Sequence, residues 1–315
     1  MIKGNAWPKR AAQKLPEECM SMPDLIPPAL TGWLVRERLR LIASEPLCGG
    51  SVASVLLLTL QGASGTEIRL VLKQMAGAGY ELFEAEAEGL KALHLKSQGS
   101  GYLRVPQVCF VNSDCLLMEY LPAAGPVPDY DQRLGRGLAL QHQQKNDYFG
   151  FSRDTFCGGT RQPNTPASDG YDFFARQRLQ VLAERCVVTG RLTRNEQYQI
   201  EQLSQRLPQL IPSQPAVMLH GDLWSGNVLI GPGGEPVLID PAVWFGWAEA
   251  ELAMTLMFGG FSRDFYAAYA EAGSVEKDWR QRADLYNLYH YLNHLLLFGG
   301  AYHSDVKRIV QYYSA

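Results

Sequence analysis

The segment from Val217 to Asp240 constrains the fold of this chain more than any other. It reads VMLHGDLWSGNVLIGPGGEPVLID, so two apolar runs enclose a polar stretch and a Gly/Pro turn. Short apolar runs bounded by turn residues are typical of buried strands. We therefore expect strands here, with Asp222 and Asn227 in the loop between them and Asp240 at the end of the last one. Polar side chains placed in this way can converge on a ligand.

The spacing of Asp222 and Asn227 is D-x-x-x-x-N, which is typical of a kinase catalytic loop. In such a loop the aspartate orients a substrate hydroxyl and takes its proton, while the asparagine and a later aspartate hold magnesium ions. The pattern predicts Asp222 as the general base, Asn227 and Asp240 as metal ligands, and ATP and Mg²⁺ as cofactors. The alternative is a strand–loop–strand unit in which a buried Asp222 only caps the loop.

The size and composition of the chain suit an ordinary globular protein, either one large domain or a two-lobed unit. It has 315 residues, 46% of them hydrophobic and 19% charged. A net charge of −3 without a basic stripe argues against a nucleic-acid partner. No apolar run approaches the roughly 20 residues that span a bilayer, so we expect no membrane segment.

Cysteine usage and the first residues bear on location. The six cysteines form no C-x-x-C pair, which indicates free thiols in a reducing compartment and hence a cytoplasmic protein. Residues 1–23 carry basic residues but no apolar core of a signal peptide, so we expect an N-terminal extension.

We assign residues 24–121 to an N-terminal lobe that binds the nucleotide. Residues 24–43 show partial helical periodicity after Pro28, and Val52–Leu60 and Ile68–Gln74 are apolar runs separated by the turn GASG. The loop before this hairpin contains small residues whose backbone amides can approach a phosphate, and we predict such a contact for Gly49, Gly50 and Ser51. The alternative is an ordinary glycine-containing turn, because the chain has neither a G-x-G-x-x-G nor a Walker motif.

Lys73 and Glu86 are predicted to form an ion pair. Alternation along Ile68–Gln74 places Lys73 on the same face as Arg69. Residues 80–96 read as a helix, and Glu86 lies on its apolar stripe, where an unpaired charge would be costly. The pair would reproduce the lysine–glutamate pair that positions nucleotide phosphates in kinases. The alternative is a solvated strand-end lysine with no relation to the helix.

A hinge between lobes is expected after two further strands, Gln107–Val111 and Cys115–Tyr120. The second strand runs into a Gly/Pro/Ala linker, and backbone groups of Glu119, Tyr120 and Leu121 are placed to contact an adenine edge. An ordinary interdomain linker is compatible with the same pattern.

We assign residues 122–315 to a C-terminal lobe that carries the catalytic and acceptor sites. It contains a long expected loop at 148–170, and helices are expected at 131–145, 171–189, 193–207, 278–297 and 302–313. The fold class is therefore α+β, with a small lobe of antiparallel sheet and one helix and a larger, mainly helical lobe. His290 and His294 are four residues apart and could share a metal, but no third ligand has suitable spacing, so we interpret them as packing or hydrogen-bonding residues.

Several segments together resemble the fructosamine kinase family, also called the ketosamine 3-kinases. The specific ones are HGDLWSGN at 220–227, IDPAVWFGWAEAELAMTLMFGGF at 239–261 and LYNLYHYLNHLLLFGGAYH at 285–303. ELFEAEAEGLKAL at 81–93 and FGFSRDTFCGGTRQPN at 149–164 are similar more loosely, and the resemblance spans residues 45–313.

The resemblance implies a protein-kinase-like fold, related to aminoglycoside and choline kinases. It implies ATP-dependent phosphorylation of the 3-hydroxyl of a ketosamine, a sugar attached to a small amine or a protein lysine, after which the labile adduct detaches. Asp222 then matches the general base, Asn227 and Asp240 the metal ligands, and Lys73 and Glu86 the phosphate-positioning pair. Trp224 falls where the family has a tryptophan beside the sugar, and we place three further residues at the acceptor site: His220, Tyr289 and His290.

The chain departs from the family pattern at several positions. The usual G-H-x-E-A-D segment has Trp247 for its histidine and Glu251 for its last aspartate. Ala53 stands where an asparagine usually follows the glycine pair. In the long loop, Asn, Ile and Pro are replaced by Thr155, Cys157 and Arg161. These positions bear on substrate preference more than on phosphoryl transfer.

Other functions remain open on sequence grounds. The acceptor could be another small alcohol or an aminoglycoside, or the chain could be a catalytically silent pseudokinase that binds a partner. Cys48, next to Gly49, could make nucleotide binding sensitive to oxidation; the alternative is an unreactive residue in a turn.

Overall fold

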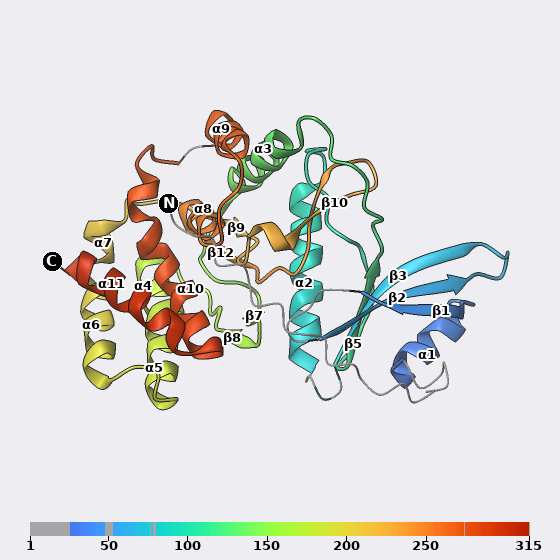
Figure 1. Ribbon diagram of the computed structural model, residues 1–315, viewed down its shortest axis with the longest axis horizontal. Coiled ribbons are helices and arrows are strands. Elements are labelled where there is room, and N and C mark those ends of the chain that lie inside the picture. The colour runs from blue at the N-terminus through green and yellow to red at the C-terminus, as the bar shows by residue number, and fades with distance from the viewer. Residues whose placement is uncertain (1–25, 48–52, 76, 78–79, 274, 315) are drawn as a thin grey trace.

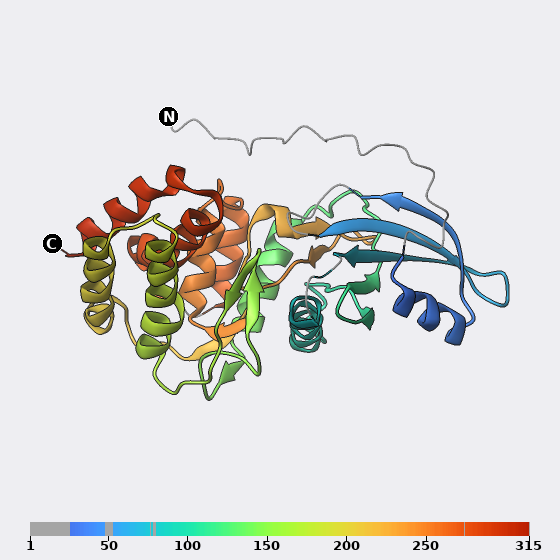
Figure 2. The same ribbon diagram turned by 90° about the horizontal axis from the view of Figure 1, so that it is seen from below.

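The computed structural model describes residues 26–47, 53–75, 77, 80–273 and 275–314. A sheet-rich lobe lies at one end of its long axis and a helical lobe at the other (Figures 1 and 2). This agrees with the predicted two-lobed α+β architecture. The predicted extension at 1–23 and the roles predicted for Cys48, Gly49, Gly50 and Ser51 fall outside the described residues.

The N-terminal lobe is built on a five-stranded antiparallel sheet in the order β1-β2-β3-β5-β4. Its strands are β1 (Arg40–Pro46), β2 (Ser54–Gln61), β3 (Glu67–Gln74), β4 (Val108–Val111) and β5 (Cys115–Glu119). Apolar side chains alternate between its two faces. Leu72 and Leu117 pack in a cluster with Leu30 of α1 (Pro28–Arg36), whereas Leu116 packs in the main core with Phe83 of α2 (Tyr80–Ser97). Each of these two helices therefore covers its own face of the sheet.

The helix expected over 24–43 is wrong in its second half. The helix ends at Arg36, and β1 begins at Arg40. Arg38 has a φ of 56°, and the N–H of Leu39 reaches back to the carbonyl of Leu34 at 2.8 Å. This is the geometry of a Schellman helix end, which usually has glycine at the left-handed position. Because an arginine occupies it here, the sequence contains no stop signal.

The C-terminal lobe is mainly helical, as predicted, and the expected helices are confirmed with small shifts at their ends. The longer ones are α3 (Tyr130–His142), α5 (Val181–Val188), α6 (Arg194–Gln205), α8 (Ala248–Leu256), α9 (Arg263–Ala272), α10 (Ala283–Phe298) and α11 (His303–Ser314). The shorter ones are α4 (Gly170–Phe174), the π-helix η2 (Ala175–Gln180), α7 (Leu207–Leu210) and the 3₁₀ turns η3 (Ser225–Asn227), η4 (Trp279–Arg282) and η5 (Gly300–Tyr302).

Short strands hold the site-bearing loops of this lobe. β9 (Ala216–Leu219) pairs with β12 (Trp244–Gly246) on one side and with β6 (Lys145–Asn146) on the other. β10 (Val228–Ile230) and β11 (Pro236–Leu238) form a hairpin. A further hairpin, β7 (Thr155–Cys157) with β8 (Thr160–Gln162), lies within 148–170, so the loop expected there is partly ordered into strands.

Residues 120–129 link the lobes without helix or strand, between β5 and α3. The division at residue 121 falls in this link and stays an interpretation. Among the described helices, none combines the length and apolarity needed to cross a bilayer. The cytoplasmic location stays a prediction from cysteine usage.

Candidate active site

A tight turn at His220–Asp222 connects β9 to the polar loop. Gly221 has a φ of 82°, and a Cβ atom on it would lie 2.1 Å from the carbonyl oxygen of Ala242. The N–H of Ala242 donates to the carbonyl of His220 at 2.8 Å. Only glycine satisfies both the left-handed backbone and this close approach. The turn thereby brings the loop that carries Asp222 against the segment that follows Asp240.

Glu251 of α8 stabilises this turn through hydrogen bonds to its backbone. Its carboxylate accepts the backbone N–H groups of His220 at 2.6 Å and Gly221 at 2.9 Å, and its side chain is buried. His220 is also fully buried; its Nε2 lies 2.8 Å from the carbonyl of Ile239, and its Nδ1 lies 3.3 Å from the N–H of Asp222. Burial lowers the pKa of His220, so we assign the neutral tautomer that donates from Nε2 and accepts at Nδ1. The imidazole thus ties the turn to the Asp240 segment.

Asp222 is half-buried and bonded to Asn227. The amide Nδ2 of Asn227 donates to the backbone carbonyl of Asp222 at 2.8 Å and to its Oδ2 at 3.2 Å. Burial raises the pKa of the Asp222 carboxyl to about 7, the hydrogen bond from Asn227 opposes this, and the charges of Asp240 and Glu251 add to it. A carboxylate of this basicity is a competent proton acceptor for a hydroxyl.

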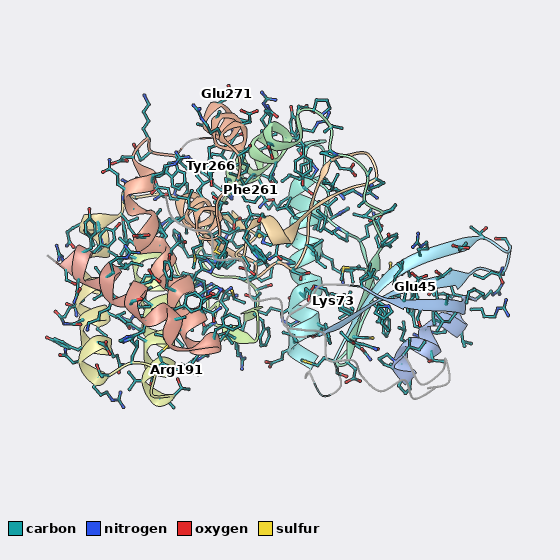
Figure 3. All side chains as sticks on the ribbon, viewed as in Figure 1. Glu45, Lys73, Arg191, Phe261, Tyr266 and Glu271 are labelled. Atoms are coloured by element: carbon teal, nitrogen blue, oxygen red, sulfur yellow. The ribbon has the colours of Figure 1, made fainter. Side chains whose placement is uncertain are left out.

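Lys73, Glu86 and Asp240 form one ion-pair cluster between the lobes. Lys73 Nζ lies 2.5 Å from Glu86 Oε1 and is also bonded to Asp240 Oδ1. Figure 3 shows Lys73 where the strands of the sheet meet α2. Burial acts to lower the pKa of Lys73, but the charges of Glu86 and Asp240 and the hydrogen bonds to them raise it above its ordinary value. The ammonium is therefore charged at neutral pH and stands between two carboxylates.

Asp240 and Asn227 offer oxygen atoms on neighbouring segments. Asp240 has a left-handed φ of 54°, which is rare outside glycine and often marks a functional position. The N–H of Ile239 donates to the carbonyl of Asn227 at 3.1 Å, so the β10–β11 hairpin brings the backbone before Asp240 next to Asn227. A carboxylate and a carboxamide are hard oxygen donors of the kind that Mg²⁺ prefers. This donor set is suited to a magnesium ion.

The hinge residues are partly engaged within the N-terminal lobe. Glu119 pairs with Arg104 at 2.5 Å, and its N–H donates to the carbonyl of Gln107 at 2.8 Å. The guanidinium of Arg69 lies 4.6 Å from the ring centroid of Tyr120. Leu121 follows at the start of the link. The adenine contact predicted for Glu119, Tyr120 and Leu121 stays a prediction.

The residues predicted for the acceptor differ in exposure. Trp224 is half-buried and packs edge-on against Phe258, with ring centroids 5.7 Å apart. Tyr289 is buried, and its hydroxyl donates to Gln162. His290 is 5% exposed and lies against the ring of Tyr289 at 4.6 Å. The structure thus brings Trp224 and the Tyr289–His290 pair to the Asp222 side of the lobe, whereas the fourth predicted residue, His220, has no exposed surface.

Arg178 is a buried charge that the sequence reasoning missed. It is fully buried in the π-helix η2 and donates to the carbonyl of Pro163 at 2.6 Å and to Asn164 Oδ1 at 2.6 Å. Its guanidinium also lies 4.3 Å from the ring centroid of Trp244 and 5.6 Å from that of Tyr289. Arg178 therefore connects the 148–170 segment to Tyr289, one of the residues predicted for the acceptor site. Arg178 lies four residues after Phe174 and four before Leu182, on an apolar helical stripe. This position could have indicated a buried arginine.

The positions that depart from the family pattern lie in different environments. Trp247 is buried among aromatic rings, including Phe174 at 5.5 Å and Tyr286 at 6.0 Å. Thr155 donates to the carbonyl of Val243 at 3.1 Å. Three further positions differ in exposure: Arg161 is exposed and pairs with Asp154, the Cys157 thiol is buried, and Ala53 is partly buried against the core.

Comparisons with known proteins agree with this geometry. The family model described as fructosamine kinase matches residues 35–315. A probable ketoamine kinase from Enterococcus faecium is 36% identical over 237 residues, which cover 73% of this chain and 82% of that protein. The chloroplastic protein-ribulosamine 3-kinase of Oryza sativa subsp. japonica is 37% identical over 247 residues, which cover 75% of this chain and 69% of that protein.

Solved structures show the same relationship. A Thermobifida fusca protein assigned as a fructosamine-3-kinase superposes with a TM-score of 0.78 at 29% identity, covering 91% of this chain and 98% of that one. A choline kinase from Streptococcus pneumoniae superposes with a TM-score of 0.58 at 14% identity, covering 91% and 98%, and at this identity shows the fold alone. The predicted protein-kinase-like fold is therefore confirmed. Since the family model extends over most of the chain, the chain belongs to the fructosamine kinase family, and it is a phosphotransferase that acts on an alcohol group.

Proposed function

We propose that this chain transfers the γ-phosphoryl group of ATP to the 3-hydroxyl of a ketosamine, carried on a small amine or a protein lysine. One observation carries the proposal: Asp222, Asn227 and Asp240 converge with the Lys73–Glu86 pair in a single site between the lobes. The named activity of the ribulosamine 3-kinase relative supports the choice of acceptor. The phosphorylated adduct would then be labile, and the free amine would be restored.

Asp222 acts on the acceptor hydroxyl in this proposal. Its carboxylate accepts the hydroxyl hydrogen bond, points the oxygen at the γ-phosphorus and takes the proton as the new O–P bond forms and the bond to the leaving ADP oxygen breaks. Asn227 fixes the carboxylate through the 3.2 Å bond to Oδ2, and Glu251 and His220 fix the backbone beneath it. We propose a positioning role for His220, because it is buried and both ring nitrogens face protein atoms.

Lys73 serves the phosphates of the nucleotide. The ammonium lies at the interface of the two lobes, and Glu86 restrains it at 2.5 Å. Asn227 and Asp240 would hold Mg²⁺, which would neutralise phosphate charge when bound. Trp224 offers a partly exposed ring on the acceptor side of Asp222, and we propose that it packs against the sugar. Tyr289 and His290 form the adjoining wall.

Replacing Lys73 by methionine is expected to lower kcat/KM for ATP by about 10²–10³-fold, the cost typical of removing one preorganised donor that stabilises charge in a transition state. Glu86 and Asp240 would also be left without their shared cation. Steady-state kinetics at varied ATP measures the effect. Lys91→Met on the exposed side of α2 is the matched control and should leave the kinetics unchanged. Equal kinetics for Lys73→Met and the parent protein would remove Lys73 from the site.

A panel of acceptors tests the proposed function. Ribulosamine, fructosamine and aminoglycoside acceptors are offered with Mg-ATP, and phosphate incorporation is measured for each. Turnover on ketosamines, with phosphate on the 3-oxygen by NMR, is the expected result. Turnover on aminoglycosides alone would show that the protein is a kinase but that its acceptor is not a ketosamine.

The silent pseudokinase is separated from both outcomes by nucleotide binding. A ligand that binds only the folded state raises apparent stability, by about 2.7 kcal/mol at a hundredfold excess over its Kd. We expect Mg-ATP to raise the melting temperature. Absence of both a shift at millimolar Mg-ATP and any turnover would identify the silent module.

A further inference from the structure

Three side chains from distant parts of the chain meet beside the catalytic loop. They are Cys157 at the end of β7, Asp222, and His290 on α10. One potential ligand atom from each, the thiol sulfur, a carboxylate oxygen and a ring nitrogen, lies within 4.8 Å of the other two. Asn227 and Asp240, the residues suited to magnesium, do not belong to this group.

His290 is the unusual member of this cluster. It is 5% exposed, and its buried Nδ1 atom has no hydrogen-bond partner among the described residues. Buried ring nitrogens are normally satisfied, so an unpartnered one calls for an explanation. Burial lowers the pKa of His290 to about 3, and His294 and Arg178 add to the effect, so the imidazole is neutral. Neutral imidazole is the form that coordinates metals.

The donor set selects the kind of cation. A thiolate, an imidazole and a carboxylate together match Zn²⁺ and other borderline ions, whereas Mg²⁺ avoids sulfur. With metal–ligand bonds of about 2.0–2.3 Å, tetrahedral geometry needs ligand atoms roughly 3.5 Å apart, so small side-chain rotations would complete the site. Three protein ligands leave one position open, as in zinc sites that bind water or substrate.

Charge balance also favours a divalent cation. Burial raises the pKa of the Cys157 thiol above its ordinary value, so without a cation the sulfur keeps its proton. A bound divalent ion would displace this proton to solvent as the metal–sulfur bond forms, with no change of oxidation state. The Asp222 carboxylate and the thiolate then offset the two charges of the ion. The positive charge of the buried Arg178 acts against cation binding, whereas the negative charges of Asp240 and Glu251 favour it.

We propose that Cys157, Asp222 and His290 form a binding site for a borderline divalent cation such as Zn²⁺, and that occupation of this site inhibits the enzyme. Coordination uses the carboxylate oxygen that would otherwise accept the hydroxyl proton. The binding step stands on the cluster alone, whereas the inhibition rests on the proposed role of Asp222 as the base. Cys157 replaces the family's usual isoleucine, so the site would belong to this chain and to relatives with the same cysteine.

Cobalt binding tests the site without reference to activity. Purified protein without nucleotide is titrated with Co²⁺ under reducing conditions, and the thiolate-to-cobalt charge-transfer band in the near ultraviolet is recorded. We expect the band in the parent protein, its loss in Cys157→Ser, and its retention in Cys109→Ser, which removes an exposed thiol. Thermal unfolding of each variant confirms that it is folded. A band of equal intensity in Cys157→Ser, or no band in the parent, would overturn the proposal.

Inhibition is then measured with Mg-ATP in excess and free Zn²⁺ held by a metal buffer. The inhibitory Zn²⁺ concentration should rise by more than about tenfold in Cys157→Ser and stay unchanged in Cys109→Ser, since loss of a ligand costs at least as much affinity as loss of an outer-shell partner. Equal sensitivity of the parent and Cys157→Ser would place the inhibition at the magnesium ligands instead and reject the inhibitory role. Cysteine-dependent cobalt binding without zinc inhibition would leave the ion site standing and count against Asp222 as the base.

Discussion

Replacing Asp222 by asparagine is expected to lower kcat about 10²–10⁴-fold, which is the usual contribution of a general base. Asparagine keeps the shape of the side chain and can still orient a hydroxyl, but it cannot accept its proton. The bond to Asn227 can be kept if the new amide presents its oxygen to Asn227 Nδ2. Single-turnover phosphorylation of the best ketosamine measures the loss, and the KM for ATP should change little.

Stability measurements distinguish a catalytic loss from a folding defect. Burial raises the pKa of Asp222, so its charged form is disfavoured in the folded protein at neutral pH. A neutral asparagine removes that cost, and the melting temperature of Asp222→Asn should not fall below that of the parent. Asp172→Asn, in an exposed pair with Arg176, is the control and should retain activity. Near-native turnover by Asp222→Asn would refute the assignment of the base.

Much of the site could be predicted because its residues break local patterns. Glu86 interrupts an apolar stripe, and Lys73 ends a strand on the face turned towards that helix; the structure joins them at 2.5 Å. Asp222 and Asn227 follow from a fixed spacing in one short loop, where a single turn sets both positions. Burying a polar or charged group without a partner is costly, so each such group indicates that a hydrogen-bonding or oppositely charged partner lies nearby.

Other parts could not be predicted, for reasons that are equally physical. The end of α1 depends on the left-handed backbone of Arg38, and an arginine in the sequence does not indicate that conformation. The β7–β8 hairpin is fixed by tertiary bonds, such as that from Gln162 Nε2 to the carbonyl of Ala242 at 3.1 Å, and not by local propensity. The meeting of Cys157 with His290 depends on how β7 docks on α10, which no spacing in the sequence encodes.

The start of α8 links the stability of the helical lobe to the catalytic turn. Glu251 accepts the N–H groups of the turn, and Glu249, two residues earlier, anchors the same helix to its neighbours. Glu249 is fully buried and accepts from Arg282 Nε at 3.0 Å, Arg282 Nη2 at 2.9 Å and the Tyr286 hydroxyl at 2.9 Å. Hydrogen bonds to Glu249 raise the pKa of Arg282 further above its already high ordinary value. Any shift of α8 would therefore reach Asp222 through Glu251.

Replacing Arg282 by leucine is expected to lower the free energy of unfolding by about 3–5 kcal/mol, because it leaves a buried carboxylate without its cation. Denaturant unfolding of the two proteins measures the difference. The control is Arg308→Leu, which breaks an exposed 2.7 Å pair with Asp284 of α10 and should cost at most about 1 kcal/mol. Turnover of Arg282→Leu should also fall, since the support of the Asp222 turn moves with α8.

The double variant Glu249→Leu/Arg282→Leu separates an unpaired charge from lost packing. Removing both partners of a buried ion pair is often close to neutral, whereas removing one is strongly destabilising. We therefore expect the double variant to be more stable than Arg282→Leu alone, with a residual deficit of about 1 kcal/mol because the Tyr286 hydroxyl loses its acceptor. A double variant less stable than Arg282→Leu would show that the hydrogen bonds to Glu249 outweigh its desolvation. In that case the ion pair itself, and not merely the avoidance of a lone charge, stabilises α8 beneath the catalytic turn.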